Sequence, residues 1–471
     1  MRQLDIAVIG SGIGGALIAS LHKDKNLILF EKDHNLGGCA STFSRYGDNY
    51  NAGATTFVGY ETGHVIKKMF DKIGFKPDLK QSYTAISTIQ NNQVLDRIED
   101  FETFLQALDT IYPHPNNRIF WSAIKKMDER FWKLKKLYFN RFSLQAWLKT
   151  FAFGVEALCT FGMQIFQSAK GFIHKTLPNI SKEYLAFIDA QLLITLQSKH
   201  DGIPLLAMAL GLAYPFHKVY YPNGGMGSLI TALLEGVDVH NKEAITRIQL
   251  ADGGYILHST KSVYFAKKVV LNTNIYDSSK LFEDGAIKRY YDKFSFSDQS
   301  AFVVYAKVKS DQDLLHHYQI ILDKQILNCI SNSFFISISD THDTKMSQDG
   351  YSVTISTHTK AFFWQTLSKE EYKKQKNATE AFILSKLQKH LPHIKVMRAF
   401  SATSKTFDRY IARLNCGGRA LSFANILQMP PCNTPFRGLY NIGDTVFAGQ
   451  GWPGVALGVS VLDQELTCNK S

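Results

Sequence analysis

The stretch that decides the fold is residues 5–31, DIAVIGSGIGGALIASLHKDKNLILFE. Residues 6–9 form an apolar, partly β-branched run of the kind that fills a buried parallel strand. Residues 16–22 follow a glycine turn and predict a helix, and residues 27–30 predict a second strand that ends at Glu31. This order of strand, turn, helix and strand predicts an α/β fold built on a parallel sheet.

The turn between the first strand and the helix has the pattern Gly-x-Gly-x-x-Gly. Gly10 permits the tight turn, Gly12 lets the backbone approach a pyrophosphate, and Gly15 lets the helix pack against the strand. Glu31 stands 19 residues after Gly12, where its carboxylate can accept hydrogen bonds from a ribose and would repel a 2′-phosphate. We therefore expect a dinucleotide site at this helix start. Its expected contacts are Gly10, Ser11, Gly12, Gly14, Gly15, Glu31 and Lys32.

Later glycine-rich segments indicate which dinucleotide to expect. Gly37-Gly38 offers a second close approach of the backbone to the cofactor, although an ordinary turn has the same composition. Residues 438–444 predict a strand that ends in Gly-Asp, and residues 452–458 begin a final helix. An aspartate at a strand end can bind the ribityl chain of a flavin, and a helix start can face its ring. FAD explains both segments, whereas NAD leaves the second one unexplained. The expected contacts here are Gly37, Gly38, Gly443, Asp444, Gly454 and Val455.

Composition places the chain among ordinary globular proteins and excludes a disordered one, because 45% of its 471 residues are apolar and 20% are charged. The formal net charge of +12 favours an anionic partner, and no nucleic-acid recognition fold accompanies it.

The six cysteines are scattered, so we expect neither a disulfide framework nor a metal site. The chain begins on a strand-like run rather than a secretory signal, and its longest uncharged apolar stretch, residues 203–216, is too short to cross a bilayer. We therefore expect a cytoplasmic protein.

These motifs resemble those of the FAD-dependent carotenoid desaturases, carotenoid isomerases and retinol saturases, which are relatives of the amine oxidase fold. The resemblance spans nearly the whole chain and rests on residues 10–15 with Glu31, 37–43, 52–53, 221–227, 269–272, 406–410 with Arg413, 417–418 and 443–458. It implies that Gly12, Gly15, Glu31, Gly38, Asp444 and Val455 contact FAD and that Ala244 lies near the adenine. Cys39 stands where many amine oxidase relatives have an arginine, which places the chain nearer the isomerases and saturases.

The motif positions predict two domains between which the chain crosses several times. A Rossmann-like FAD-binding domain with a parallel sheet is expected from residues 1–75, 215–285 and 435–471. An α+β substrate-binding domain with a mixed sheet and helices is expected from residues 76–214 and 286–434.

Residues 125–170 form a candidate membrane-associating stretch. Its first part, residues 125–141, carries seven basic residues and only two acidic ones, with aromatic residues among them. An apolar stripe at helical spacing follows: Trp147, Phe151, Val155, Leu158 and Ile165. Basic residues attract anionic lipid at about 1 kcal/mol each, and aromatic side chains prefer the headgroup layer. A buried core helix beside a solvated basic face would have the same pattern, so the sequence leaves both interpretations open.

The expected reaction is hydride exchange between the flavin and a long apolar isoprenoid polyene, by desaturation, saturation or cis–trans isomerisation. Such chemistry needs contact in a dry tunnel and no strong side-chain acid or base, which agrees with a sequence without a convincing nucleophile or triad. Arg409, Tyr410 and Arg413 are the candidates for the flavin end of the tunnel, although a salt-bridged surface loop would contain the same residues.

Two alternatives remain open. One is a flavin oxidase acting on an amine or another small polar substrate. The other is a non-catalytic binder of prenyl groups, which the intact Gly12, Glu31 and Asp444 disfavour because such binders lack a complete flavin site.

Overall fold

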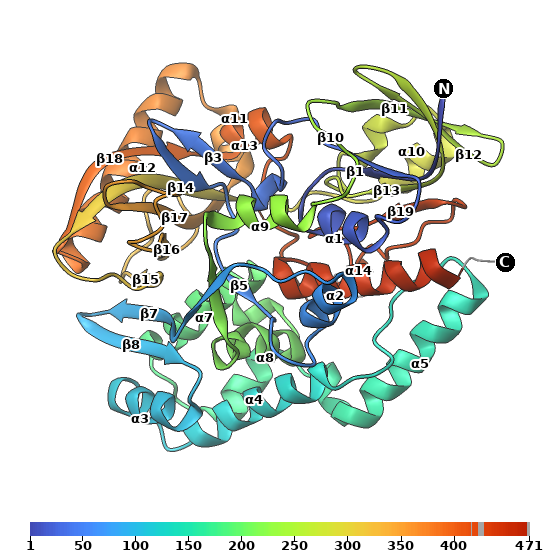
Figure 1. Ribbon diagram of the computed structural model, residues 1–471. Helices are drawn as coiled ribbons and strands as arrows, with labels where there is room; N and C mark the ends of the chain where they lie inside the picture. The colour runs from blue at the N-terminus through green and yellow to red at the C-terminus, as the bar shows by residue number, and fades with distance from the viewer. Residues whose placement is uncertain (416, 423–427, 469–471) are drawn as a thin grey trace.

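Residues 1–415, 417–422 and 428–468, which the computed structural model describes, contain two seven-stranded sheets (Figure 1). The strands of the first sheet are β1 (Arg2–Ile9), β2 (Leu27–Phe30), β10 (Val239–His240), β11 (Ile245–Ala251), β12 (Gly254–Ser259), β13 (Val263–Leu271) and β19 (Leu439–Asn441). Their order is β10-β2-β1-β13-β12-β11, with β19 on β13. The pairs among β10, β2, β1, β13 and β19 are parallel, and β12 and β11 continue the sheet as an antiparallel hairpin. The parallel sheet predicted from residues 5–31 is confirmed.

Helix α1 (Ile13–Leu21) connects β1 to β2. It begins three residues earlier than the sequence predicts, because Gly12 already serves as its N-cap. Helix α14 (Gly451–Cys468) packs against α1, so segments from opposite ends of the chain lie side by side (Figure 1). Helices α2 (Val65–Ile73) and α9 (Gly225–Leu233) also contact α1. Together they cover the apolar side chains of β1 and β13, which are among the most deeply buried in the molecule.

The second sheet consists of β7 (Thr84–Gln90), β8 (Gln93–Ile98), β14 (Gln299–Ser310), β15 (His317–Ile321), β16 (Ser333–Ile338), β17 (Tyr351–Lys360) and β18 (Ile394–Ala402). Its order is β18-β14-β17-β16-β15-β7-β8, and only β15 and β7 pair in parallel. Alternation along β14 separates its two faces. Phe302 and Val304 share a core with α12 (Lys369–His390), whereas Val303 and Tyr305 point to the opposite face, where the cavity described below lies.

A layer of helices follows β8. It consists of α3 (Phe101–Ile111), α4 (Asn117–Trp132), α5 (Leu144–Phe161), α6 (Ala169–Thr176), α7 (Lys182–Leu196) and α8 (Leu205–Ala213). Most of these helices bury a core around Trp121 and Phe187. Helix α5 differs, because its buried residues are only Ala146 and Phe161. It lies at the edge of the molecule, away from both large sheets (Figure 1).

Shorter elements complete the described part of the chain. The strands are β3 (Thr42–Arg45) paired with β4 (Asp48–Asn51), and β9 (Val219–Pro222) between β5 (Phe57–Val58) and β6 (Leu79–Ser82). The helices are α10 (Gly285–Tyr291), α11 (Ala361–Thr366) and α13 (Ser404–Ile411). The 3₁₀ turns are η1 (Gly38–Ala40), η2 (Gly162–Phe166), η3 (His200–Gly202), η4 (Tyr214–Phe216) and η5 (Ser278–Leu281).

The chain crosses repeatedly between the two large sheets. The first sheet takes its strands from residues 2–30, 239–271 and 439–441. These strands fall within the pieces expected for the FAD-binding domain, although Tyr138 and Ala146 of the helical layer also pack into its core. The exact domain boundaries therefore stay a prediction.

Candidate functional site

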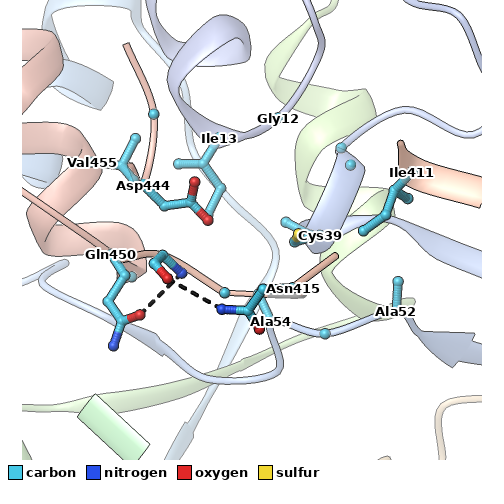
Figure 2. Close-up of a pocket in the computed structure, with 18 of the residues that line it drawn as sticks. Gly12, Ile13, Cys39, Ala52, Ala54, Ile411, Asn415, Asp444, Gln450 and Val455 are labelled. Atoms are coloured by element: carbon cyan, nitrogen blue, oxygen red, sulfur yellow. Dashed lines mark hydrogen bonds between the residues drawn. The ribbon is translucent and has the colours of Figure 1, made fainter. Parts of the chain in front are cut away.

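A cavity of about 1230 Å³ is lined by residues from both large sheets and from the helical layer. This volume exceeds the range of about 300–1,000 Å³ that is typical of a site for one small ligand. Gly12 and Ile13 at the start of α1 reach its wall, and so do Asp444 after β19 and Val455 in α14 (Figure 2). The cavity therefore joins the two glycine-rich segments and has room for a second ligand beside an extended cofactor.

The glycine turn after β1 brings backbone rather than side chains to this cavity. Gly10, Gly12 and Gly14 line it, and Gly10 has a φ of +100°, which L side chains rarely adopt. A Cβ on Gly15 would lie 2.0 Å from the carbonyl oxygen of Gly10, so Gly15 lets α1 approach β1 without itself lining the cavity. No side chain caps α1 at Gly12, and its first turn has no acidic residue. The positive end of α1 is therefore open to an anion.

Glu31 lines the cavity at the end of β2 and is held by three hydrogen bonds. Its Oε2 accepts from the Ser11 backbone N (2.9 Å) and the Ser11 Oγ (2.6 Å), and its Oε1 accepts from the Asp33 backbone N (3.0 Å). The Ser11 Oγ accepts in turn from the backbone N of Gly37 (2.9 Å). Ser11 is fully buried and does not line the cavity, so it acts by fixing Glu31 beside the second glycine doublet.

The second doublet, Gly37-Gly38, lines the cavity beside the first glycine turn. Both residues have positive φ angles, +111° and +57°. A Cβ on Gly38 would lie 3.8 Å from the Cα of Gly12, so the two glycine segments face each other at close range. Lys32 also lines the cavity, and its Nζ donates to the carbonyl oxygen of Tyr410 (3.3 Å).

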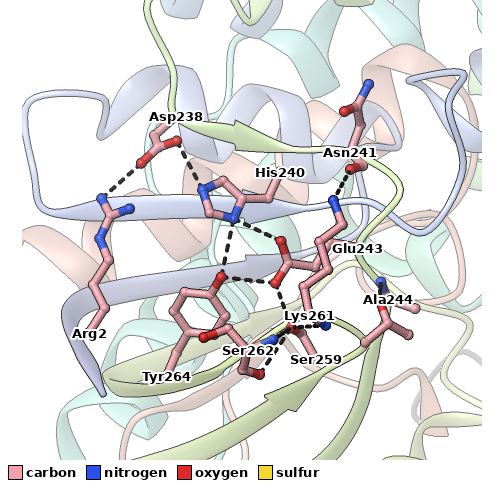
Figure 3. Close-up of polar contacts among 11 residues, drawn as sticks. Arg2, Asp238, His240, Asn241, Glu243, Ala244, Ser259, Lys261, Ser262 and Tyr264 are labelled. Atoms are coloured by element: carbon pink, nitrogen blue, oxygen red, sulfur yellow. Dashed lines mark hydrogen bonds and ion pairs between the residues drawn. The ribbon is translucent and has the colours of Figure 1, made fainter.

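Ala244 lines the same cavity, in the segment that joins β10 to β11. Figure 3 shows how polar contacts fix this segment. The imidazole of His240 bridges Asp238 (3.3 Å) and Glu243 (3.0 Å), and the Tyr264 hydroxyl donates to Glu243 (2.9 Å). The backbone N of Glu243 donates to the carbonyl oxygen of Glu31 (2.9 Å). Ala244 is therefore held close to Glu31, on the side of the cavity where the adenine is expected.

On the other side of the cavity, Asp444 is paired with Arg413. Nη2 of Arg413 lies 3.1 Å from Oδ2 of Asp444 and donates to the carbonyl oxygen of Gly417 (2.6 Å). Gly443, whose φ is +117°, precedes this aspartate, and both line the cavity with Gly454 and Val455 of α14. Arg413 therefore lines the cavity and orients Asp444, and its place at the flavin end of a tunnel stays a prediction.

The other two candidates for the flavin end of the tunnel lie differently. Tyr410 lines the cavity but is mostly exposed. Arg409 is exposed and outside the cavity wall, with its guanidinium 5.4 Å from the centroid of the Tyr410 ring. Since hydride exchange requires contact with the reacting carbon, this position of Arg409 does not suit a catalytic residue.

Asn272, the last residue of the motif 269–272, was not predicted as a cofactor contact, and it lies between the two glycine-rich segments. A Cβ on Gly10, Gly12, Gly14 or Gly443 would come within 2.8–2.9 Å of Asn272 atoms. Its Nδ2 donates to the carbonyl oxygen of Gly10 (3.2 Å), and Asn272 lines the cavity. The available signal was its position directly after the strand-like residues 263–271.

Gln450 and Asn415 were also missed. Both are bonded to Gly418: its backbone N donates to Oε1 of Gln450 (3.1 Å), and its carbonyl oxygen accepts from Nδ2 of Asn415 (3.2 Å). Figure 2 labels Gln450 and Asn415 and marks these bonds with dashed lines. Nε2 of Gln450 donates to the carbonyl oxygen of Thr195 in α7 (2.6 Å). These contacts connect the start of α14 to the helical layer across the cavity wall.

The residues present fit FAD. Two helix starts, those of α1 and α14, line one cavity together with glycines that leave room for backbone contact. Glu31 and Asp444 supply carboxylate acceptors of the kind that bind ribose and ribityl hydroxyl groups. The buried Nε1 of Trp452, also in the cavity wall, has no hydrogen-bond partner within the described residues, so it can donate to a polar ligand atom.

A double-mutant cycle tests the pairing of Arg413 with Asp444. We expect Arg413→Ala to weaken FAD binding about tenfold, because a partly buried carboxylate loses a charged donor. Combining it with Asp444→Asn should show a coupling energy of about 1–2 kcal/mol in FAD titrations. The exposed Arg437 provides a control, since Arg437→Ala should leave the affinity unchanged. Strictly additive effects of the two changes would contradict the pairing.

Among the residues described, no group of three or more histidine, cysteine or acidic side chains is placed to hold a metal ion. None of the helices in this part of the chain is long and apolar enough to span a bilayer. Cys159, Cys329 and Cys432 are free thiols. Cys416 and the side chain of Cys468 lie outside the described part of the structure.

Comparisons with known proteins give the family. The family described as "Flavin containing amine oxidoreductase" matches residues 17–376 of this chain. Prolycopene isomerase 2 of an Oncidium hybrid cultivar is 26% identical over 97% of this chain and 82% of the relative. Carotenoid 3,4-desaturase of Haloarcula japonica is 23% identical over 68% of this chain and 66% of its own length. A solved oxidoreductase from Methanosarcina mazei shares the fold, with a TM-score of 0.67 at 17% identity over 98% of this chain and all of that one.

The family match covers most of the chain, and the glycine segments, Glu31 and Asp444 lie together at one cavity. The chain therefore belongs to the flavin containing amine oxidoreductases, and it is an FAD-dependent oxidoreductase related to carotenoid isomerases and desaturases.

Proposed function

We propose that the protein acts on a long apolar isoprenoid polyene, a carotenoid or retinoid, which it desaturates, saturates or isomerises by hydride exchange with FAD. The proposal rests on the apolar lining of the cavity away from the glycine segments. Its wall there includes the apolar side chains of Ala190, Leu193, Ile194, Leu210, Val303 and Phe335. The names of the relatives, prolycopene isomerase and carotenoid 3,4-desaturase, support the same substrate class.

Each proposed site residue has a separable task. Gly12, Gly38 and the start of α14 would hold the cofactor through backbone contacts, and Glu31 and Asp444 would bind its hydroxyl groups. FAD supplies the hydride acceptor and donor when bound. Arg413 is a positioning residue that acts through Asp444. The apolar wall excludes water and keeps the reacting carbon in contact with the ring, and for such a substrate specificity comes from the shape of the cavity.

Two histidines of the cavity wall, His64 and His358, should be uncharged near neutral pH. Burial lowers the pKa of His64 to about 3, with a further contribution from His217, and burial lowers the pKa of His358 to about 4. The unfolded chain binds protons at these imidazoles below their ordinary pKa of about 6.5, whereas the folded chain does not until the lower values are reached. We therefore expect the free energy of unfolding to fall as the pH drops from about 6.5 towards 4.

Urea unfolding of the FAD-loaded protein across this pH range measures the effect. His358→Gln should make the free energy of unfolding fall less steeply as the pH drops, because the variant lacks one imidazole whose pKa is lowered in the folded protein. If the free energy of unfolding of that variant fell with pH as steeply as that of the wild type, His358 would not contribute to the loss of stability in acid.

The function is tested by incubating FAD-loaded protein with carotenoid and retinoid isomers in detergent and separating the products by chromatography. Conversion of a polyene supports the proposal. Hydrogen peroxide released on addition of an amine, without any change in the polyenes, would favour the amine oxidase alternative instead.

A variant that fills the cavity sharpens this test. Leu210 in α8 lines the cavity, so Leu210→Trp should reduce polyene conversion at least about tenfold while the flavin content stays at the wild-type level. Leu206 on the same helix packs into the core of the helical layer and does not line the cavity. Leu206→Trp is therefore the matched control and should convert polyene much faster than Leu210→Trp. Equal activities would place the substrate elsewhere.

A further inference from the structure

Helix α5 presents its apolar face to solvent. Six of its large apolar side chains, spaced three or four residues apart or adjacent, are between 44% and 80% exposed, and two more follow in η2. We call this surface the α5 stripe; its residues are Leu144, Trp147, Leu148, Phe151, Val155, Leu158, Met163 and Phe166. A helix at the surface of a protein normally packs its apolar stripe against the core. A contiguous exposed apolar surface therefore marks a binding site.

The charged residues of α5 confirm that the helix is turned outward. Its two charged side chains are Lys149 and Glu156, and both are half-buried on the side facing the protein. Glu156 accepts hydrogen bonds from the backbone N of Lys135 (3.0 Å) and of Lys136 (2.7 Å), and Nζ of Lys149 lies 5.0 Å from the centroid of the Tyr138 ring. The polar face of α5 thus binds the protein, and the apolar face is left without a partner within the described residues.

The segments before and after the stripe in the sequence are positively charged. Residues 131–176 contain seven basic residues and one acidic residue, Glu156, and so carry half of the net charge of +12. Lys133, Lys135, Lys136, Lys170 and Lys175 are exposed, and in the part of the chain that the structure describes none of them is within ion-pair distance of a carboxylate. An exposed apolar helix face, with exposed lysines in the segments before and after it, matches an anionic bilayer, where apolar side chains enter the acyl region and ammonium groups meet phosphate.

The segment that leads to the stripe begins at the wall of the cavity. Phe131 and Trp132, the last residues of α4, line the cavity, and the segment that follows them leads directly to α5. Resting on the proposed function, we infer that the α5 stripe lies flat in the surface layer of an anionic lipid bilayer and brings the cavity to the membrane in which an apolar polyene dissolves. A second copy of this chain or another protein would not require the surplus of unpaired lysines.

Flotation of the FAD-loaded protein with lipid vesicles tests this inference without any substrate. We expect binding to phosphatidylcholine vesicles that contain about one third phosphatidylglycerol, and much weaker binding to phosphatidylcholine alone or at high salt. Phe151→Asp combined with Leu148→Asp should weaken vesicle binding about 100-fold, because two anchoring side chains become charged. Leu250→Asp, at an equally exposed leucine on β11, is the matched control and should bind like the wild type.

The charge component has its own pair of variants. Lys135→Glu with Lys136→Glu should weaken binding to anionic vesicles by more than about tenfold, at roughly fivefold or more for each residue. Lys373→Glu with Lys374→Glu on the exposed face of α12 makes the same change in net charge and should have a small effect. Quenching of Trp147 by brominated lipid, absent in Trp147→Phe, reports insertion directly.

The outcomes of these experiments distinguish a failure of membrane binding by the α5 stripe from a failure of the proposed function. Vesicle binding that depends on the α5 stripe without polyene conversion in detergent would leave the surface intact and overturn the proposed function. Polyene conversion in detergent by a wild-type protein that floats with neither vesicle would overturn the docking surface. A wild-type dimer that Phe151→Asp dissociates, again without flotation, would overturn it as well and assign the stripe to a second copy of the chain.

Discussion

Replacement of Gly15 by alanine is expected to prevent the protein from folding with bound FAD. The added Cβ would lie 2.0 Å from the carbonyl oxygen of Gly10, a backbone atom in the turn that lines the cavity. That oxygen cannot move aside as a flexible side chain can, so α1 has to shift away from β1. Such a clash costs at least about 4 kcal/mol, a large part of the 5–15 kcal/mol by which most domains are stable. Soluble yield and visible flavin absorbance after purification measure the result.

Gly154 provides the control for this variant, because it also lies within a helix. A Cβ on Gly154 meets no atom within 4 Å, so Gly154→Ala is expected to leave FAD binding unchanged and to stabilise α5 by up to about 1 kcal/mol. Normal flavin content in Gly15→Ala would show that α1 and β1 do not need this close approach, and the account of the glycine turn would then be wrong.

Replacement of Glu31 by alanine is expected to weaken FAD binding about 100-fold, equivalent to about 3 kcal/mol. The change removes the proposed ribose acceptor. It also leaves three donors without their carboxylate, namely the backbone N and Oγ of Ser11 and the backbone N of Asp33. The Ser11 Oγ also holds Gly37, so the second glycine doublet should loosen at the same time. FAD titration together with the melting temperature of the FAD-free protein separates the two contributions.

The graded series around this position makes the test specific. Glu31→Gln retains one acceptor oxygen and should lose about tenfold in affinity, between the wild type and Glu31→Ala. Asp252→Ala removes an exposed carboxylate from the turn between β11 and β12 and should have no effect. If Glu31→Ala bound FAD as tightly as the wild type, Glu31 would have no role at the cofactor.

The cofactor side of the fold could be predicted because its signals are local. Between residue 5 and Glu31, each step depends on residues close in sequence: an apolar run, a turn that only glycine allows, and an acid at a strand end. The same reasoning could not find Asn272 or Gln450. Their contacts with Gly10 and with Thr195 join residues more than 250 positions apart, so they exist only after the sheet and α14 have formed.

Two positions show where residue type alone was insufficient. Arg413 was expected at the flavin end of the tunnel, which stays a prediction; it lines the cavity, and its hydrogen bonds go to Asp444 and Gly417, which a spacing argument does not reveal. For α5, periodicity predicts a helix with an apolar stripe and is identical whether that stripe faces inward or outward. The structure turns Trp147 and Phe151 outward, so the buried core helix is excluded, whereas Ile165 packs partly into the helical layer.

The position of β19 and α14 has a consequence for biosynthesis. β19 pairs with β13, and α14 supplies one wall of the cavity, yet both lie at the carboxyl side of everything else described. A growing polypeptide cannot capture the nucleotide while these segments remain inside the ribosome, so cofactor loading must follow the synthesis of α14. Until then the unfilled groove between the sheets exposes apolar surface to the cell, and nucleotide supply should govern how much newly made enzyme escapes proteolysis.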